Sequence, residues 1–238
     1  MKRICLTFAL PALLAMVSCS TQYVVNGTST VESLEGQTLY LKVYQNDEMQ
    51  TIDSSSVVHG KFRFGGIFDS TMMANVFLGD ASVMPIVIEQ GQVSMKIDET
   101  TQSATGTPLN DSLTNFIRRK TQLDAQLAEL PQKEAQMIMA GMDIDEINEL
   151  LNEEADGLAE QNDRLVTRFI LTNSNNVLGP GIFMILTSNF RFPVLNPLIE
   201  EITTHASPYF MNHPYVKEYL KAAEANMEKI REQQLKGD

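Results

Sequence analysis

One cysteine near the start of the chain has the sequence context of a lipid-attachment site. Cys19 follows a short cationic start, an apolar run and the small residue Ser18, which is the layout of a secretory signal with its cleavage point. Cleavage between Ser18 and Cys19 leaves a thiol at the new N-terminus, where a thioether to diacylglycerol can form. Residues 14–19, LAMVSC, look like a lipobox with Met16 where leucine is usual. We therefore predict a signal peptide over residues 1–18 and lipidation of Cys19.

A retained membrane anchor or buried helix is the alternative interpretation of the apolar run from Ile4 to Val17. About 20 apolar residues are needed to cross a bilayer, whereas this run is shorter and contains Pro11. The best later candidate, Ile182 to Leu186, has only the length of a core helix segment. We therefore favour cleavage, with membrane contact through the acyl chains.

The body after Cys19 is acidic and has no free cysteine. The chain carries a formal net charge of −12, and removal of Lys2 and Arg3 with the signal peptide makes the body still more acidic. Such a balance argues against nucleic acid, which needs a basic footprint, and against adsorption to anionic lipid. Because Cys5 leaves with the signal peptide and Cys19 is acylated, we expect neither disulfides nor cysteine-based metal sites.

Three histidines could act as acid–base groups or metal ligands. His59 precedes Gly60 in a predicted hairpin turn, while His205 and His213 lie in a connection between predicted helices. The last two are eight residues apart and lack His-Glu-x-x-His spacing, so they form a weak motif. We expect turn and helix-cap roles, with no catalytic or metal-binding histidine.

A methionine run could bind Cu(I) through its thioethers. Met139 and Met142 share a helix face, but Met137 points nearly away from Met139. We therefore expect these side chains to fill irregular apolar gaps, and we predict no metal site.

Acidic clusters and glycine pairs are the remaining candidates for a metal-binding or nucleotide-binding site. The cluster around Asp143 lacks the glycine of a calcium loop and leads into an apolar helix pattern, so it indicates a solvated helix face. Gly65-Gly66 and residues 179–181, GPG, match neither a phosphate loop nor a dinucleotide fingerprint. The sequence contains no Gly-x-Ser-x-Gly nucleophile motif either. The remaining acidic positions of interest are Asp145, Glu146, Glu149, Glu153, Glu154, Glu200 and Glu201.

Apolar residues alternate from Tyr23 to about Ile97, which predicts strands with one buried face. Turn-forming residues at 34–37, 45–48 and 89–92 separate the runs. Five to eight short strands with such turns indicate an antiparallel β-sandwich or an open barrel. The inward positions that carry this prediction include Leu39, Leu41, Val43, Phe62, Phe64, Val93, Met95 and Ile97.

After Gly106 the apolar residues recur at steps of three and four, which predicts helices. Thr107 is predicted to cap the first helix, with Pro108 at its first position. Pro131 is expected to interrupt that helix.

Asp143 and Glu146 have capping-box-like spacing before a long amphipathic helix that ends near Asn173. The GPG segment at 179–181 is expected to be a connection. Further helices are predicted over about 182–186, 194–202 and 214–234.

Five stretches of the chain carry a resemblance to a known family: residues 52–66, 86–93, 106–111, 169–178 and 213–216. In these stretches the chain resembles envelope lipoproteins of Bacteroidetes with an N-terminal domain of unknown function (domain of unknown function 4369), usually followed by a thioredoxin-like domain. The resemblance implies an envelope location and a β-domain. Family members that act on thiols carry a Cys-x-x-Cys pair on the later domain. This sequence has no such pair, so redox activity is not implied.

We therefore predict an α+β protein in which an N-terminal antiparallel β-sandwich is followed by a C-terminal all-helical region. Its segments are a signal peptide over 1–18, a lipidated tether over 19–22, the β-sandwich over 23–106 and a helical domain over 107–238. The expected role is non-catalytic binding or interaction by a lipid-anchored envelope protein without a cofactor.

Two alternatives remain for the function. The first is an accessory subunit of a separate thioredoxin-like envelope oxidoreductase. The second is a hydrolase with two carboxylates in a cleft between the sandwich and the helices. Residues 20–23, STQY, lack the acidic residues that similar surface-exported lipoproteins often carry after the cysteine. We therefore expect an outer-membrane protein that faces the periplasm.

Overall fold

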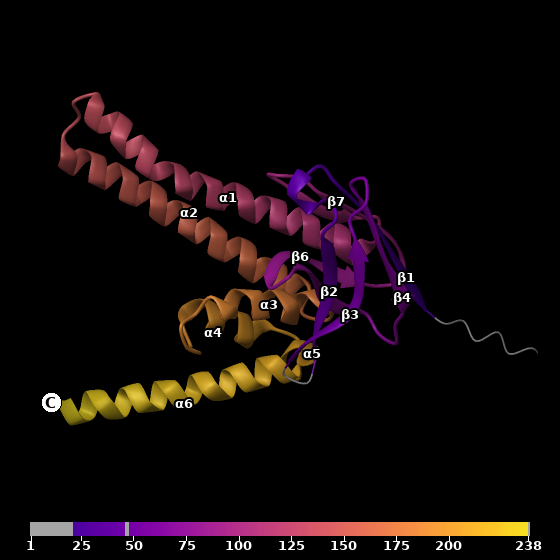
Figure 1. Cartoon of the computed structure of the whole chain (residues 1–238). Coiled ribbons are helices and arrows are strands. Elements are labelled where there is room, and N and C mark those ends of the chain that lie inside the picture. The colour runs from indigo at the N-terminus through magenta and orange to yellow at the C-terminus, as the bar shows by residue number, and fades with distance from the viewer. Residues whose placement is uncertain (1–20, 46–47, 238) are drawn as a thin grey trace, which may run out of the picture.

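The computed structural model describes residues 21–45 and 48–237, with side chains described as far as Glu232. The predicted cleavage and lipidation positions, Ser18 and Cys19, lie outside these residues. In the described chain, eight strands precede six helices, so the predicted α+β class is confirmed (Figure 1). The strands are β1 (Gln22–Ser29), β2 (Thr38–Gln45), β3 (Glu48–Ser56), β4 (Lys61–Ile67), β5 (Met72–Leu78), β6 (Ala81–Ile88), β7 (Gly91–Ile97) and β8 (Gln102–Thr105), with a short 3-10 helix, η1 (Glu32–Leu34), after β1. The helices are α1 (Pro108–Met139), α2 (Ile144–Thr172), α3 (Leu178–Ser188), α4 (Pro197–His205), α5 (Pro208–Met211) and α6 (Pro214–Gly237).

The strands form two four-stranded sheets, in the orders β4-β1-β7-β8 and β3-β2-β5-β6. Two separate sheets exclude the open barrel considered above. The pairs are antiparallel except β1 and β7, which run parallel and so depart from the predicted antiparallel sandwich. Because the other sheet is built between these two strands in the sequence, no local turn sets their relative direction.

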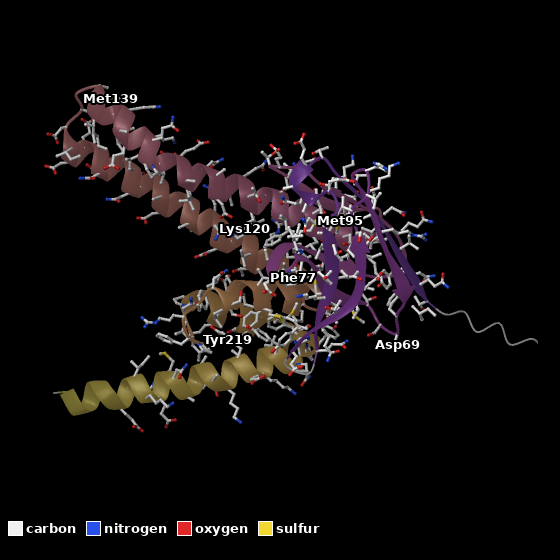
Figure 2. The ribbon with its side chains drawn as sticks, in the orientation of Figure 1. Asp69, Phe77, Met95, Lys120, Met139 and Tyr219 are labelled. Atoms are coloured by element: carbon white, nitrogen blue, oxygen red, sulfur yellow. The ribbon has the colours of Figure 1, made fainter. Side chains whose placement is uncertain are left out.

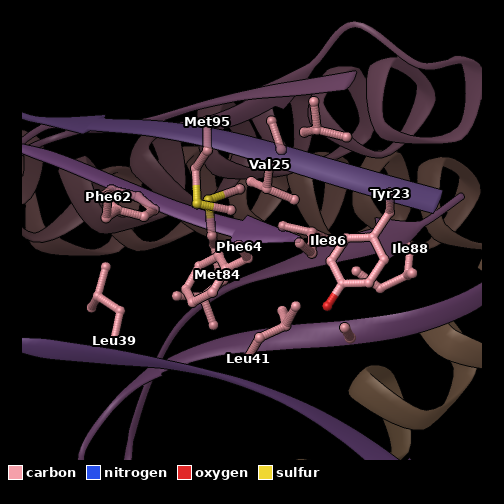
Figure 3. Close-up of a cluster of buried hydrophobic side chains, with 14 of the residues drawn as sticks. Tyr23, Val25, Leu39, Leu41, Phe62, Phe64, Met84, Ile86, Ile88 and Met95 are labelled. Carbon is pink, nitrogen blue, oxygen red and sulfur yellow. The ribbon is translucent and has the colours of Figure 1, made fainter. Parts of the chain in front are cut away.

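Alternating apolar side chains fill the space between the two sheets, as Figure 3 shows. Leu39, Leu41 and Phe64 are completely buried. The rings of Phe62 and Phe64 meet edge to face, with their centroids 5.8 Å apart. The predicted inward faces are therefore confirmed.

A tight turn at His59 and Gly60 joins β3 to β4. Their φ angles are 51° and 66°, the signs that a two-residue hairpin turn of type I′ requires. A Cβ atom on Gly60 would lie 2.6 Å from the carbonyl oxygen of Ser29, so glycine is needed there for space as well. The Glu35 carboxylate accepts hydrogen bonds from the backbone N–H groups of Gly60 and His59, which hold the pKa of Glu35 below its usual range. The predicted turn position of His59 is confirmed.

Side chains of β3 join the edges of the two sheets. The backbone N–H of Gly65 donates to Asp53 Oδ2, and that of Arg63 donates to Ser55 Oγ, each at 2.9 Å. These bonds satisfy edge donors that would otherwise offer a pairing site to another strand. Burial, together with the nearby Asp53 charge, raises the pKa of Tyr23 to about 12.

The helices α1 and α2 form a long hairpin that projects from the body (Figure 1). Asp143 caps α2 as predicted, since its carboxylate accepts from the backbone N–H groups of Asp145 at 2.9 Å and Glu146 at 3.4 Å. Figure 2 shows Met139 at the far tip of this hairpin.

Pro131 lies inside α1, which continues to Met139, so the predicted interruption is wrong. Proline removes a backbone donor and favours a kink. However, α2 packs along α1, and Lys133 forms an ion pair with Glu154 just beyond the proline. Contacts between the helices outweigh the local preference.

The helix α3 begins at Leu178 and therefore contains the GPG segment at 179–181, which was predicted to be a connection. Pro180 is tolerated because a helix leaves its first N–H groups without intrahelical acceptors. The side chain of Asn176 supports this start by accepting a hydrogen bond from Leu178 N at 2.9 Å.

The helices predicted over about 194–202 and 214–234 are both present, with shifted ends. The helix α4 covers Pro197–His205 instead of about 194–202, because Asn196 Oδ1 accepts from Ile199 N at 2.9 Å and thereby caps its start. The helix α6 begins at Pro214 as predicted and extends to Gly237.

One sheet separates two apolar cores. On β6, the side chains of Ile86 and Ile88 belong to the sandwich core, whereas Val87 between them belongs to the helical core. This alternation follows from the two-residue period of a strand. The helices therefore cover the outer face of the β3-β2-β5-β6 sheet.

Asn110, in the first turn of α1, joins the helical region to the edge of β6. Its Oδ1 accepts from Val87 N at 2.9 Å, and its Nδ2 donates to Val87 O at 2.8 Å, as a neighbouring strand residue would. Glu89 Oε1 accepts from the backbone N–H groups of Leu109 and Asn110 at 3.0 and 3.2 Å. The Thr107 hydroxyl makes no backbone cap bond and instead accepts from Asn110 Nδ2, so Glu89 does the capping predicted for Thr107.

We predict that Asn110→Leu lowers the free energy of unfolding by about 2–4 kcal/mol, because it leaves the buried N–H and C=O of Val87 without partners. Urea denaturation followed by circular dichroism measures this change. The matched control, Asn115→Leu on the exposed side of α1, should change stability by no more than about 0.5 kcal/mol. Equal stability of the two variants would contradict the role of Asn110.

Candidate functional site

A pocket of about 290 Å³ lies between the sandwich and the helical region. Strands β2, β3, β5 and β6 form one wall, and residues of α3, α5 and the α5–α6 connection form the other. Pockets at such junctions are frequent binding sites because two rigid surfaces meet there. We refer to it as the interlobe pocket.

Neighbouring strands bring the sheet wall of the pocket together. Lys42 pairs in register with Asn75, which pairs in register with Pro85 on β6. These positions alternate with buried residues such as Ala74 and Val76, so they lie on the outer face of the sheet. Pro85 is compatible with this place because β6 is an edge strand.

A close approach of α3 to β5 forms the opposite wall. A Cβ atom on Gly181 would lie 2.5 Å from Cγ of Met73, so a larger residue would push α3 away from the sheet. Met184 and Ile185, one turn further along α3, then line the pocket.

Hydrogen bonds and aromatic contacts hold the pocket's surroundings in place. The hydroxyls of Thr187 and Tyr215 lie 2.8 Å apart and join α3 to α6. Tyr215 also meets Tyr44 of β2 edge to face, with centroids 6.4 Å apart. The position of α6 is thereby tied to both walls.

His213 lines the pocket from the connection between α5 and α6. Its Nδ1 atom is buried and has no hydrogen-bond partner among the described residues. Burial lowers the pKa of His213, because removal from water disfavours the imidazolium. The side chain is therefore neutral at pH 7, and the pocket gains no charge from it.

The chemistry of the pocket is apolar and rich in methionine. Met49, Met72, Met73 and Met184 line it, and such flexible thioether side chains adapt to guests of irregular shape. Lys42 also lines it, but its ammonium donates to Gly79 O at 3.3 Å and lies 4.6 Å from the centre of the Phe77 ring. No aspartate or glutamate lines the pocket in the part of the chain that the structure describes. The arrangement can hold an apolar group.

The three histidines lie in different parts of the structure. His59 occupies the β3–β4 turn, and His205 is the exposed last residue of α4, with its Nδ1 2.9 Å from Glu201 O. Within residues 21–45 and 48–237, no three His, Cys, Asp or Glu side chains gather as metal ligands would. Only His213 reaches the pocket.

The methionine run and the acidic clusters lie away from the interlobe pocket. Met139, 80% exposed, lies at the hairpin tip, and Met142 follows in the connection to α2. Asp143 caps α2, Glu154 pairs with Lys133, and the other acidic positions singled out above lie on α2 and α4. For the described carboxylates this arrangement does not supply the interlobe pair that the hydrolase alternative requires.

Sequence reasoning did not identify the pocket residues Tyr44, Met73 and Met184. Strand alternation showed which residues share a face, but it could not show that α3 covers that face. The GPG segment at 179–181 was the available signal, because glycine permits the close approach of α3.

Comparison with known proteins gives one match. Residues 23–113 match a family described as Domain of unknown function (DUF4369), which confirms the resemblance predicted for the N-terminal part. The match extends past the last strand into the first turns of α1, which include Asn110 and its bonds to β6. No curated protein and no solved structure matches the chain.

No helix among the described residues is both long and apolar enough to span a membrane.

We predict that the free energy of unfolding falls as the pH decreases from 7.5 to below the ordinary histidine pKa of about 6.5. The lowered pKa of His213 means that the unfolded chain takes up its proton first, so acid favours unfolding. Urea denaturation at several pH values should show that the free energy of unfolding changes less with pH in His213→Gln than in the parent. His205→Gln, an exposed replacement, is the matched control. If the free energy of unfolding of His213→Gln changes with pH as much as that of the parent, His213 is not the source of the effect.

Proposed function

We propose that this chain, in which residues 23–113 carry the domain of unknown function, is a lipid-anchored cell-envelope protein with a non-catalytic binding role. The sequence at 14–19 supports the anchor, with diacylglycerol on Cys19. Residues 20–23, which lack acidic side chains, support attachment to the outer membrane with the body in the periplasm.

The interlobe pocket is the observation that carries the binding role. Its volume of about 290 Å³ is at the lower end of small-molecule sites, and it suits one or two apolar side chains or a short hydrocarbon segment. Burying such a group contributes about 25 cal/mol per Å² of apolar surface. Methionine side chains on both walls can adjust to the guest.

The remaining alternatives differ in their requirements. A hydrolase needs paired carboxyl groups with displaced pKa values in a cleft. Glu35, whose pKa is lowered, lies instead on the exposed surface near the β3–β4 turn. An accessory role beside a thioredoxin-like protein is compatible with the pocket, which could receive an apolar side chain from such a partner.

We predict that Cys19→Ala abolishes incorporation of a clickable palmitate analogue in cells, because the variant lacks the sulfur that accepts lipid. Gel fluorescence after labelling measures incorporation. Cys5→Ala is the matched control and should label like the parent, since Cys5 lies within the predicted signal peptide. Equal labelling of Cys19→Ala and parent would disprove the lipid anchor and would leave the proposed binding in the interlobe pocket untouched.

We predict that the full-length protein in mild detergent binds the neutral fluorophore N-phenyl-1-naphthylamine at one saturable site. Ile185→Glu should weaken this binding by at least about fivefold, because it places a charge at the apolar wall. Ile144→Glu is the matched control: both isoleucines are roughly half exposed, at 41% and 49%, but Ile144 lies at the start of α2. Fluorescence titration measures the dissociation constant of the fluorophore for each variant. If Ile185→Glu binds like the parent while its melting temperature is unchanged, the pocket is not the site.

A further inference from the structure

A second groove, of about 690 Å³, lies on one face of the α1–α2 hairpin. Residues 119, 122, 123 and 126 of α1 and 161, 164, 165 and 168 of α2 line it at helical spacing. Glu201 of α4 also lines it. Figure 2 labels Lys120, the neighbour of Arg119, between the body and the hairpin tip.

Three arginines give this groove a positive character in an acidic protein. Arg119, Arg164 and Arg168 all line it, although the chain has a net charge of −12. Arg164 forms an ion pair with Glu160, one turn before it on α2. Within the described part of the chain, neither Arg119 nor Arg168 has a carboxylate within ion-pair distance.

The two unpaired arginines lie at the same level of the hairpin. Phe116 of α1 and Phe169 of α2 stack with their centroids 4.2 Å apart, which aligns the helices. Arg119 follows Phe116 by about one turn, and Arg168 directly precedes Phe169. Like charges held together on facing helices favour a bound anion.

The rest of the groove has features of a peptide site. Leu123 and Leu165 supply apolar surface, and Gln122 and Gln161 supply amides that can both donate and accept hydrogen bonds. Thr167, only 6% exposed, also lines the groove, and its hydroxyl has no partner among the described residues. A buried polar group left unsatisfied is unfavourable, so a ligand that satisfies it after a rotamer change gains affinity.

We propose that this arginine groove binds an acidic peptide segment of a partner protein, a role that goes beyond the interlobe pocket. Guanidinium groups match carboxylates with two parallel hydrogen bonds. Arg164 and Arg168 are separated by about 6 Å along the helix axis, close to the spacing of about 6.6 Å between alternate side chains of an extended peptide. A segment with glutamate at alternate positions therefore fits the stripe of arginines.

An extended anionic surface fits this groove less well. Exposed acidic residues flank the arginines on both helices, including Asp124, Glu160 and Asp163. A membrane or a nucleic acid would approach these carboxylates together with the arginines and be repelled. A narrow peptide can contact the groove alone.

The test is fluorescence polarisation of a labelled Glu-Leu-Glu-Leu-Glu peptide with the full-length protein in neutral detergent. Arg119→Gln combined with Arg168→Gln should raise the Kd by about tenfold or more, through the loss of two charge-assisted contacts. The matched control, Arg63→Gln with Arg118→Gln, makes the same change of net charge with residues outside the groove and should stay within about twofold. The Gln-Leu-Gln-Leu-Gln peptide should bind at least about tenfold more weakly to the parent.

Three results would overturn the proposal: no binding of the acidic peptide, equal weakening by both double variants, or preferential binding of phosphatidylglycerol vesicles by the groove arginines. Binding of N-phenyl-1-naphthylamine should be unchanged in Arg119→Gln with Arg168→Gln, because the interlobe pocket is separate. This measurement of fluorophore binding distinguishes failure of the peptide-binding proposal from failure of the proposed function.

Discussion

The side-chain amide of Asn110 joins the two halves of this protein. It binds both backbone groups of Val87 on β6 and is completely buried. An edge strand needs partners for its polar groups wherever water is excluded, and here a helix residue supplies them. Glu89, just beyond β6, then caps the same helix from the sheet side. This junction fixes the start of α1 relative to the sandwich, and the contacts of α3 with β5 and of α6 with β2 place the later helices.

The sheet β3-β2-β5-β6 has an apolar core on each face, and the interlobe pocket lies on its outer face. Val87 packs with the helices while its neighbours pack inside the sandwich. Gly181 allows α3 to approach Met73 closely, and the space that remains beside this contact is the interlobe pocket. The α1–α2 hairpin projects from the body (Figure 1), and no residue that lines its arginine groove also lines the interlobe pocket.

Much of the fold follows from local patterns. Alternation identified the buried faces around Leu39 and Phe64, and the Asp143 cap was predicted from its spacing. Two of the errors concern proline. Pro131 and the GPG segment at 179–181 carry signals that break helices, yet both lie within helices: α2 packs along α1 beside Pro131, and Pro180 lies in the first turn of α3, where N–H groups have no intrahelical acceptors. A local preference of a few kcal/mol can be exceeded by such packing.

The sequence by itself determined the secondary-structure periods, the hairpin turn at His59-Gly60, and the absence of a Cys-x-x-Cys pair, because each depends on residues close together in the chain. Only the tertiary structure decided that β1 pairs in parallel with β7, that Met73 faces Gly181, and that Arg119 and Arg168 line one groove. These arrangements bring together residues far apart in the sequence. Their formation depends on which surfaces bury together, and periodicity along one segment carries no information about its partner.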